Sequence, residues 1–312
     1  MKKLTIREAG DFFQARDNFL LITHCRPDGD TAGSAAALCL GLRKMGKRAN
    51  ILENPELTPR YVPLHKGLTV STPSGKETVV SVDVASENMF PQNYNDKVAF
   101  RVDHHGTGTA FAECQWVEPD AAACGDMIFS LLQELEIPMD REIAEAIYTA
   151  VSTDTGCFRY SNTDSHSFAV ASACAQAGAR IYEINQALFE TESLNRLRLQ
   201  GRLVENAKFY RDGKMVLCTI PYVWTREMGL TQDDMDNISG YPRTIAGVEL
   251  ASTIRENPDG SCKLSVRAIP GYDAAALCGT FGGGGHKGAA GATITLPLEE
   301  TVKAVEAAML AL

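Results

Sequence analysis

Acidic and imidazole side chains follow apolar runs at several separate places in this sequence. The run VAFRV ends in Asp-His-His at residues 103–105, in a chain of 312 residues with only six histidines. The other residues of this kind are His24, Asp28, Asp30, Asp83 and Asp154. Carboxylates and imidazoles together are typical ligands of divalent transition ions. If these segments meet in space, they therefore indicate a metal site.

The apolar runs have the length and composition of strands that are buried on both faces of a parallel sheet. NFLLITH, RANIL, TVVSVD and KVAFRVD are short, rich in β-branched residues and bounded by turns. Periodic segments predict helices at about 6–15, 31–45, 122–136, 140–152, 164–177 and 181–189. This alternation predicts an α/β fold with a doubly wound parallel sheet. The carboxyl ends of its strands would meet in one crevice, where we expect the Asp and His residues to converge.

Each acidic residue also has an ordinary structural explanation when it is taken alone. Asp28 or Asp30 could be the N-cap of the helix that follows. Asp83 could end its strand in a turn, and Asp154 could cap one. The group is harder to explain in this way, because four carboxylates in one crevice repel one another unless cations are bound. Two divalent ions would balance their charge.

The pattern of predicted secondary structure changes after about residue 210. Residues 193–210 have the pattern of one polar, Leu- and Arg-rich helix. The segments KMVLCTI, VELASTIRE and CKLSVRAI after it are strand-like, without long helices between them. We therefore predict a catalytic domain at 1–190, a helical linker at 191–210 and a smaller α+β domain at 211–312.

Charge and composition argue against several classes of protein. The net charge is −9, and residues before Arg198 carry −8 of it, which disfavours a surface for duplex nucleic acid. No apolar run approaches the roughly 18 residues of a membrane span, and charged residues near the N-terminus argue against a signal peptide. The nine cysteines include no C-x-x-C pair. We expect reduced thiols in a cytoplasmic protein that has neither a disulfide framework nor a zinc knuckle.

Four glycines at 282–285 stand directly before His286 and Lys287. Such a run could be a flexible turn. It is not a Walker A loop, because the G-K-[ST] ending is missing. Glycines before a His-Lys pair let backbone N–H groups approach an anion closely, beside positive charge. We therefore favour a phosphate-binding loop.

Taken in order, these segments resemble the motifs of the DHH phosphoesterase family. The matching segments are H-x-x-x-D-x-D at 24–30, the isolated Asp83, D-H-H at 103–105, and Asp154. The VRAI segment and FGGGGHKGAAG at 281–291 are similar to the substrate domain of its nano-RNA exonuclease and pAp phosphatase subfamily. The resemblance covers nearly the whole chain.

The resemblance implies two metal sites that share one ligand. The implied ligands of one ion are His24, Asp28 and Asp83, and those of the other are Asp30, Asp83, His104 and Asp154. Asp103 would orient a histidine, and His105 would face the substrate phosphate as a hydrogen-bond donor or general acid. The implied binding residues for the other end of the substrate are Arg267, Gly283, Gly284, Gly285 and His286.

The activity implied is hydrolysis of a phosphoester by a hydroxide that two divalent ions activate. Mixed carboxylate and imidazole ligands favour manganese over magnesium. Short single-stranded oligonucleotides (nano-RNA) would give mononucleotides, and 3′-phosphoadenosine 5′-phosphate (pAp) would give AMP. Alternatives are a phosphodiesterase for c-di-AMP or pApA, an exopolyphosphatase and a non-catalytic nucleotide-binding module. Substrate preference, metal identity, cleavage direction and whether the chain forms a homodimer stay open.

Overall fold

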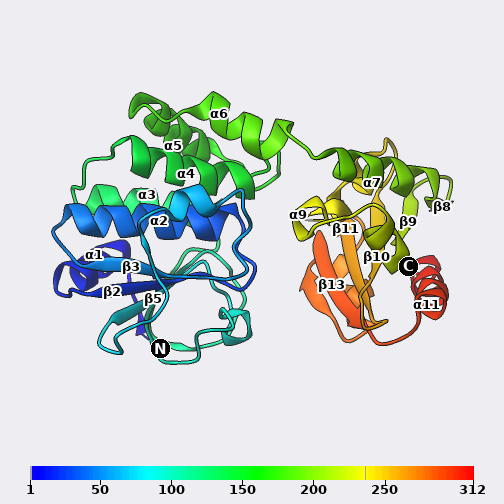
Figure 1. The fold of residues 1–312 in the computed structure, drawn as a ribbon, viewed down its shortest axis with the longest axis horizontal. Coiled ribbons are helices and arrows are strands. Elements are labelled where there is room, and N and C mark those ends of the chain that lie inside the picture. The colour runs from blue at the N-terminus through cyan, green and yellow to red at the C-terminus, as the bar shows by residue number, and fades with distance from the viewer. Residues whose placement is uncertain (1, 236) are drawn as a thin grey trace. The chain divides into compact units, whose positions relative to one another are not determined.

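The chain divides into two compact units, Met1–Thr191 and Glu192–Leu312, in the computed structural model, which describes residues 2–235 and 237–312 (Figure 1). The division differs from the predicted linker at 191–210. Helix α7, Leu194–Glu205, packs into the second unit through the buried Leu199 and Leu203. The chain then forms the short strand β8, Lys208–Tyr210, instead of continuing as a helix. This segment is therefore part of the second unit.

The first unit is built on a parallel sheet of seven strands in the order β1-β7-β6-β5-β2-β3-β4. Its strands are β1 Lys2–Lys3, β2 Phe19–Ile22, β3 Ala49–Leu52, β4 Thr69–Val70, β5 Thr78–Val82, β6 Val98–Asp103 and β7 Ala112–Val117. All of its strand pairs are parallel, which confirms the predicted α/β class and parallel sheet. Strands β1, β4 and β7, which lie at or next to the sheet edges, were not predicted from the sequence.

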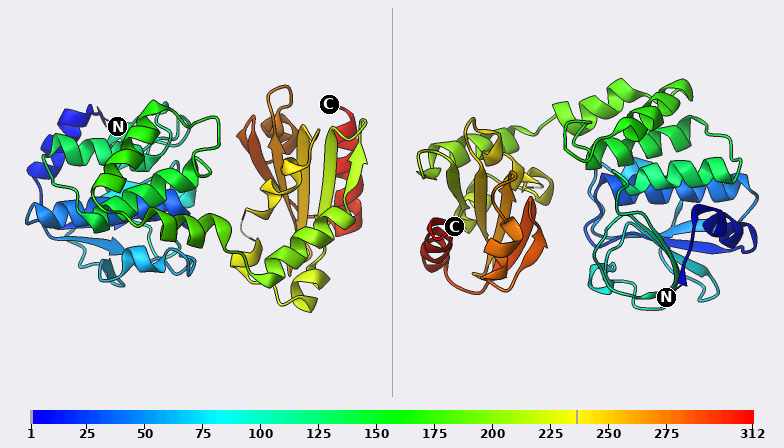
Figure 2. Two further views of the ribbon diagram at one scale, coloured as in Figure 1. Left: turned by 90° about the horizontal axis from the view of Figure 1, so that it is seen from above. Right: turned by 180° about the vertical axis from the view of Figure 1, so that it is seen from behind.

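The helices of the first unit lie over one face of this sheet in successive layers (Figures 1 and 2). They are α1 Ile6–Gln14, α2 Gly29–Lys44, α3 Cys124–Glu134, α4 Arg141–Asp154, α5 Ser165–Gln176 and α6 Ile181–Asn185, with a π-helical turn at Gln186–Glu190. Phe19 and Leu21 share a core with α1, α2 and α3. Leu20 and Ile22 point the other way, into a smaller cluster that Tyr94 helps to close. Phe90 and Tyr94, which follow the short 3-10 helix Glu87–Met89, and Phe111 before β7 pack into this cluster on the second face.

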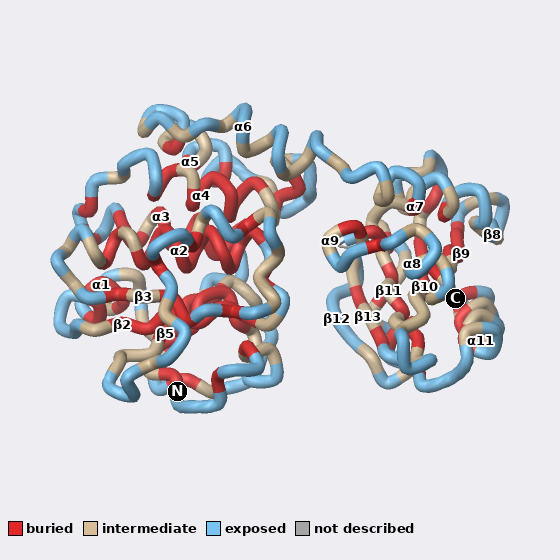
Figure 3. Tube along the Cα trace, in the orientation of Figure 1, coloured by how far each residue is buried: buried red, intermediate tan, exposed pale blue. Residues whose placement is uncertain are grey.

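Helix α2 lies between the sheet and α4, and its residues are buried almost throughout (Figure 3). A Cβ atom at Gly33 would lie 2.4 Å from the carbonyl oxygen of Ala146 in α4, so only glycine allows the two helices to approach this closely. Asp28 caps the helix, because its Oδ1 accepts the N–H groups of Asp30 and Thr31, each at 3.1 Å. Gly46, at φ +77°, ends it as predicted.

The second unit contains a mixed sheet of six strands in the order β12-β13-β11-β10-β9-β8. Its remaining elements are β9 Met215–Ile220, α8 Tyr222–Glu227, α9 Gln232–Met235, the 3-10 helices η4 Ile238–Gly240 and η5 Pro242–Thr244, β10 Leu250–Glu256, β11 Cys262–Ala268, α10 Ala274–Gly279, β12 Gly284–His286, β13 Ala289–Ile294 and α11 Leu298–Leu310. Leu277 of α10 and Val305 of α11 pack on one face of the sheet, and α7 packs on the other. Across the described parts of both units, no helix combines the length and apolarity needed to cross a bilayer.

Candidate metal centre

The predicted acidic and histidine residues lie mainly at the carboxyl ends of three central strands. His24 follows β2, Asp83 follows β5, and Asp103 is the last residue of β6. Strands β2 and β5 are neighbours, and the chain leaves them toward opposite edges of the sheet, to β3 and β6. Open α/β sheets bind their ligands at such a switch point, because the loops diverge there and leave a crevice.

Three overlapping groups of described side chains could hold a cation, one of them formed by Asp83, His104 and His105. Another contains His24, Asp28 and Asp83. The Nε2 atom of His24 is 3.6 Å from Oδ1 of Asp28 and 3.9 Å from Oδ2 of Asp83. The Nδ1 atom of His24 lies 2.8 Å from the carbonyl oxygen of Cys25, which can only accept a hydrogen bond. In the neutral ring Nδ1 therefore carries the proton, and the Nε2 lone pair faces the two carboxylates.

A second group contains Asp30, His104 and Asp154, the last residue of α4. The Nε2 atom of His104 is 3.7 Å from Oδ2 of Asp30 and 3.8 Å from Oδ2 of Asp154. Its Nδ1 atom lies 3.0 Å from the carbonyl oxygen of Ala121. As in His24, the neutral ring therefore carries its proton on Nδ1 and has its lone pair on Nε2. These separations exceed hydrogen-bond lengths but suit ligand atoms that each lie about 2.0–2.2 Å from a shared ion.

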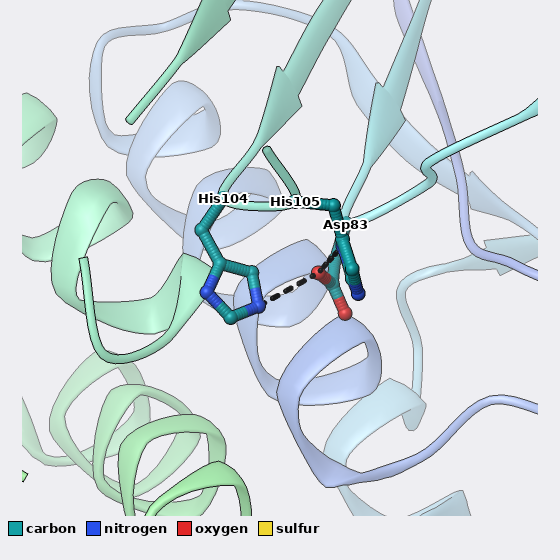
Figure 4. Close-up of side chains that lie close together, drawn as sticks. All are labelled: Asp83, His104 and His105. Atoms are coloured by element: carbon teal, nitrogen blue, oxygen red, sulfur yellow. Dashed lines mark ion pairs between the residues drawn. The ribbon is translucent and has the colours of Figure 1, made fainter. Parts of the chain in front are cut away.

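Asp83 connects the two groups. Its Oδ2 faces His24, and its Oδ1 lies 3.6 Å from Nε2 of His104, with both adjacent histidines directed toward it (Figure 4). The residue is only 2% exposed, and Oδ1 finds no hydrogen-bond donor among the described residues. Its backbone is left-handed, with φ +60°, a conformation that is uncommon outside glycine and concentrates at functional sites. A buried carboxylate with these neighbours fits a ligand that bridges two cations.

The N-terminus of α3 holds the carboxylate of Asp30 in place. Its Oδ2 accepts the N–H of Cys124 at 2.7 Å, and its Oδ1 accepts the N–H of Gly125 at 2.9 Å. The hydroxyl of Ser34 donates to Oδ1 at 3.0 Å. This segment and the carbonyl of Ala121 could not be predicted from residue types, because they act through backbone atoms.

Burial and mutual repulsion disfavour the charged forms of Asp30, Asp83 and Asp154. Asp28 is the exception: burial raises its pKa, but His24 and backbone N–H groups outweigh burial and lower it to about 2. Burial, together with Asp30, raises the pKa of Asp154 to about 8. Burial and the neighbouring carboxylates raise the pKa of Asp83 well above its ordinary value. Burial lowers the pKa of His104, but Asp30 and Asp154 outweigh it, so the net shift is upward. Bound divalent cations would stabilise the charged carboxylates and offset both their burial and their mutual repulsion. The donor set therefore fits divalent cations.

Asp103 lies behind the histidines and orients one of them. It is fully buried, and its Oδ2 accepts hydrogen bonds from the buried guanidinium of Arg101, including one from Nε at 3.0 Å. Its Oδ1 accepts from Nδ1 of His105 at 2.7 Å and from the backbone N–H of His105 at 3.1 Å. His105 therefore has its Nδ1 occupied and only Nε2 free. Arg101 was also missed, since one charge inside an apolar run carries no specific signal.

Comparison with known proteins matches both units. Residues 18–151 match the DHH family, N-terminal domain, and residues 213–311 match the DHHA1 domain. A Thermus thermophilus protein named bifunctional oligoribonuclease and PAP phosphatase NrnA is 31% identical over 88% of this chain and 83% of its own length. The chain belongs to the DHH family. Its recognition from sequence, and the expectation of a phosphoesterase hydrolase, are thereby confirmed.

Two further relatives of this DHH-family chain extend over most of its length. A Bacillus subtilis protein with the same name is 26% identical over 89% of this chain and 90% of its own. A solved structure, an exopolyphosphatase-related protein from Bacteroides fragilis, superposes with a TM-score of 0.88 at 24% identity, over 98% and 95% of the two chains. The latter shows that the fold is shared.

In the DHHA1 unit, sheet register brings the predicted substrate-binding residues together. Arg267 of β11 pairs with Ala289 of β13, and Ala289 pairs with His286 of β12. Directly paired residues project to the same face, so Arg267 and His286 share a face two strands apart, about 10 Å by ordinary strand spacing. Both belong to the face opposite the core formed with α10 and α11.

The second half of the glycine segment in this DHH-family chain belongs to an edge strand, which corrects the prediction of a loop for Gly284 and Gly285, whereas Gly282 and Gly283 precede the strand. Gly284–His286 forms β12 and pairs with β13. A Cβ atom at Gly283 would lie 2.2 Å from the carbonyl oxygen of Gly291, and one at Gly285 would lie 2.6 Å from that of Ala289. Close backbone approach thus accounts for these two glycines. An edge strand still leaves alternate N–H groups unpaired, so an anion could bind there.

Alanine at His104 and alanine at His105 should have different effects on the DHH-family protein. His104→Ala should lose metal, because its Nε2 faces three carboxylates. His105→Ala should keep nearly normal metal content and lose about 100-fold or more in turnover, the usual contribution of a proton donor. Elemental analysis and steady-state rates would measure both, with the exposed His166→Ala as control. Equal metal loss in the two variants would contradict the assignment.

Proposed function

We propose that this DHH-family enzyme hydrolyses short oligonucleotides to mononucleotides and pAp to AMP, using two divalent ions. The observation that carries the proposal is the position of Asp83 between two donor groups, with one carboxylate oxygen facing each. The names of the Thermus thermophilus and Bacillus subtilis relatives, which specify oligoribonuclease and PAP phosphatase, support the choice of substrates.

The two donor groups would hold one ion each. The proposed ligands are His24, Asp28 and Asp83 for one ion, and Asp30, Asp83, His104 and Asp154 for the other. Manganese suits this mixture of imidazole and carboxylate ligands better than magnesium, which prefers oxygen. When bound, the two ions would lower the pKa of a water molecule and neutralise charge on the phosphoryl oxygens.

The chain itself orients the metal-binding histidines and positions the proton that His105 would donate. In the neutral rings of the two ligand histidines, the carbonyl oxygens of Cys25 and Ala121 select the tautomer that leaves the Nε2 lone pair available to an ion. Asp103 accepts the Nδ1–H of His105 and stabilises that ring when it is charged. We assign His105 the role of donating from Nε2 to the substrate phosphate or to the leaving oxygen.

In the DHHA1 unit, we propose that Arg267, His286 and the amides of Gly283, Gly284 and Gly285 bind the part of the substrate remote from the ions. Alanine at Arg267 or His286 should then reduce dinucleotide cleavage about tenfold or more, since charge-assisted hydrogen bonds to phosphate are strong. Hydrolysis of bis(p-nitrophenyl) phosphate, which is small, should change little.

The ratio of kcat/KM on the two substrates measures this selectivity. Lys303→Ala is the matched control, because Lys303 is exposed on α11, which covers the opposite face of the sheet. Equal losses on both substrates would indicate a structural role for Arg267 and His286. No loss on either would remove this face from the binding site.

One substrate screen tests the proposed function as a whole. Purified protein with manganese would be given pAp, di- to pentanucleotides, c-di-AMP, pApA and inorganic polyphosphate. We expect the highest kcat/KM on pAp or the short oligonucleotides. A strong preference for c-di-AMP or for polyphosphate would contradict the substrate assignment. Absence of turnover on every substrate, with metal bound, would favour a binding module.

A further inference from the structure

The segment directly after Asp154 has an uncommon backbone conformation. Gly156, Cys157 and Phe158 are three successive residues in the left-handed region, with φ of +57°, +58° and +60°. Residues with a Cβ atom rarely adopt this conformation singly, and consecutive occurrences are rarer. Such conformations persist where the surrounding structure enforces them, often at ligand sites.

Specific contacts stabilise this conformation within the turn that residues 155–162 form. The hydroxyl of Thr155 donates to the carbonyl oxygen of Val151 at 2.6 Å and accepts the N–H of Phe158 at 3.1 Å. The N–H of Cys157 donates to the carbonyl oxygen of Ser152 at 2.6 Å. The ring of Phe158 stacks on Phe168 of α5, with centroids 5.5 Å apart. The turn is therefore anchored to α4 and α5.

The turn presents an aromatic ring and a guanidinium. A Cβ atom at Gly156 would lie 2.3 Å from Cζ of Tyr160 and 2.5 Å from Cε1 and Cε2, so the ring lies directly against the Gly156 backbone. Tyr160 is nevertheless 47% exposed. The Nε atom of exposed Arg159 donates to the carbonyl oxygen of Gly156 at 2.6 Å. Its other guanidinium nitrogens meet no carboxylate within the described parts of the chain.

Both ends of the turn are tied to the candidate metal centre. It begins next to Asp154, a proposed ligand. It ends at Asn162, whose Nδ2 donates to the carbonyl oxygen of Ala122 at 2.9 Å and lies 3.4 Å from Oδ2 of Asp154. Ala121, the neighbour of Ala122, holds His104. Residues 155–162 therefore form part of the rim of that centre.

We propose that residues 155–162 are a nucleotide-recognition loop, in which Tyr160 stacks on the base and Arg159 contacts a phosphate of the nucleotide bound at the metal centre. A supported and half-exposed aromatic ring suits any base, because every base has a π face. The planar guanidinium suits a phosphate and opposes the negative charge of the carboxylates around it. This inference rests on the proposed function and adds that the base itself is recognised. Inorganic polyphosphate, which has no base, would gain nothing from Tyr160.

Two small phosphates separate the roles of the two side chains. AMP carries a base and a phosphate, whereas ribose 5-phosphate carries the phosphate alone. Titration calorimetry on the manganese-loaded protein would measure their affinities without turnover. Tyr160→Leu should weaken AMP about tenfold or more, the usual effect of losing one stacked base, and should leave ribose 5-phosphate unchanged. Arg159→Gln should weaken both compounds to the same extent.

Controls distinguish recognition from structure. Tyr160→Phe should bind AMP like the wild type, because stacking needs the ring and not the hydroxyl. Tyr182→Leu, which changes a 67% exposed tyrosine on α6, should have no effect. Metal content should be normal in all of these variants. Unchanged AMP affinity in Tyr160→Leu, or equal weakening of AMP and ribose 5-phosphate, would overturn the inference. Failure of the wild type to hydrolyse pAp or oligonucleotides would instead overturn the proposed function.

Discussion

Removing divalent ions should lower the hydrolysis of every phosphoester substrate by about a thousandfold or more. The metal centre gathers Asp28, Asp30, Asp83 and Asp154, and among the described residues the ion pairs of these carboxylates are with three histidines, His24, His104 and His105. Without ions, nothing else in this centre can lower the pKa of water or balance phosphoryl charge. The loss corresponds to the several kcal/mol that metal ions contribute to such transition states.

The measurement is activity after exhaustive chelation and dialysis, followed by addition of one metal at a time. We expect manganese to restore more activity than magnesium, because imidazole ligands disfavour magnesium. The same additions should raise the Tm of the protein, since an ion that binds only the folded state stabilises it. Full activity in the chelated protein, with elemental analysis showing no metal, would contradict the metal assignment.

Asp83→Asn should be the most damaging single substitution in the metal centre, with a loss of about a thousandfold or more in kcat. The amide keeps the shape of the side chain but removes the negative charge that both ions would share. Each oxygen of Asp83 faces a different histidine, so the substitution weakens both sites, whereas Asp154→Asn affects only one. Lost metal-ligand charge of this kind removes several kcal/mol of stabilisation from the transition state.

Metal stoichiometry and turnover would be measured together for this variant. Asp212→Asn is a suitable control, because Asp212 is exposed in the second unit and also has a left-handed backbone, with φ +55°. An Asp83→Asn protein that holds two ions and turns over normally would show that Asp83 does not bridge. A loss smaller than that of Asp154→Asn would also contradict the prediction.

The sequence alone was sufficient to predict the parallel sheet and the residues gathered at its carboxyl edge. Strands buried on both faces leave continuous apolar runs, and the polar residues that end such runs are easy to recognise. His24, Asp83 and the Asp-His-His segment could be grouped because parallel strands deliver their carboxyl ends to one edge. For these residues, the position directly after a strand is enough to predict the position in space.

Tertiary structure decided the features that depend on partners distant in sequence. Helix α4 packs directly on α2 because Gly33 lets the two backbones approach closely at Ala146, a contact between residues far apart in sequence. Composition could not distinguish a loop from an edge strand at residues 284–286, since the difference lies in pairing with β13.

The same limit applies to the site. The residues that hold the ligands in place act through backbone atoms or buried contacts: Cys25, Ala121, Cys124, Gly125 and Arg101. Asp30 shows the contrast. Its type and its place after β2 marked it as a candidate from sequence, but its orientation comes from α3, more than 90 residues away. Residue type thus determined which groups could bind metal, and folding alone determined how their lone pairs are aimed, because hydrogen bonds from remote backbone set that direction.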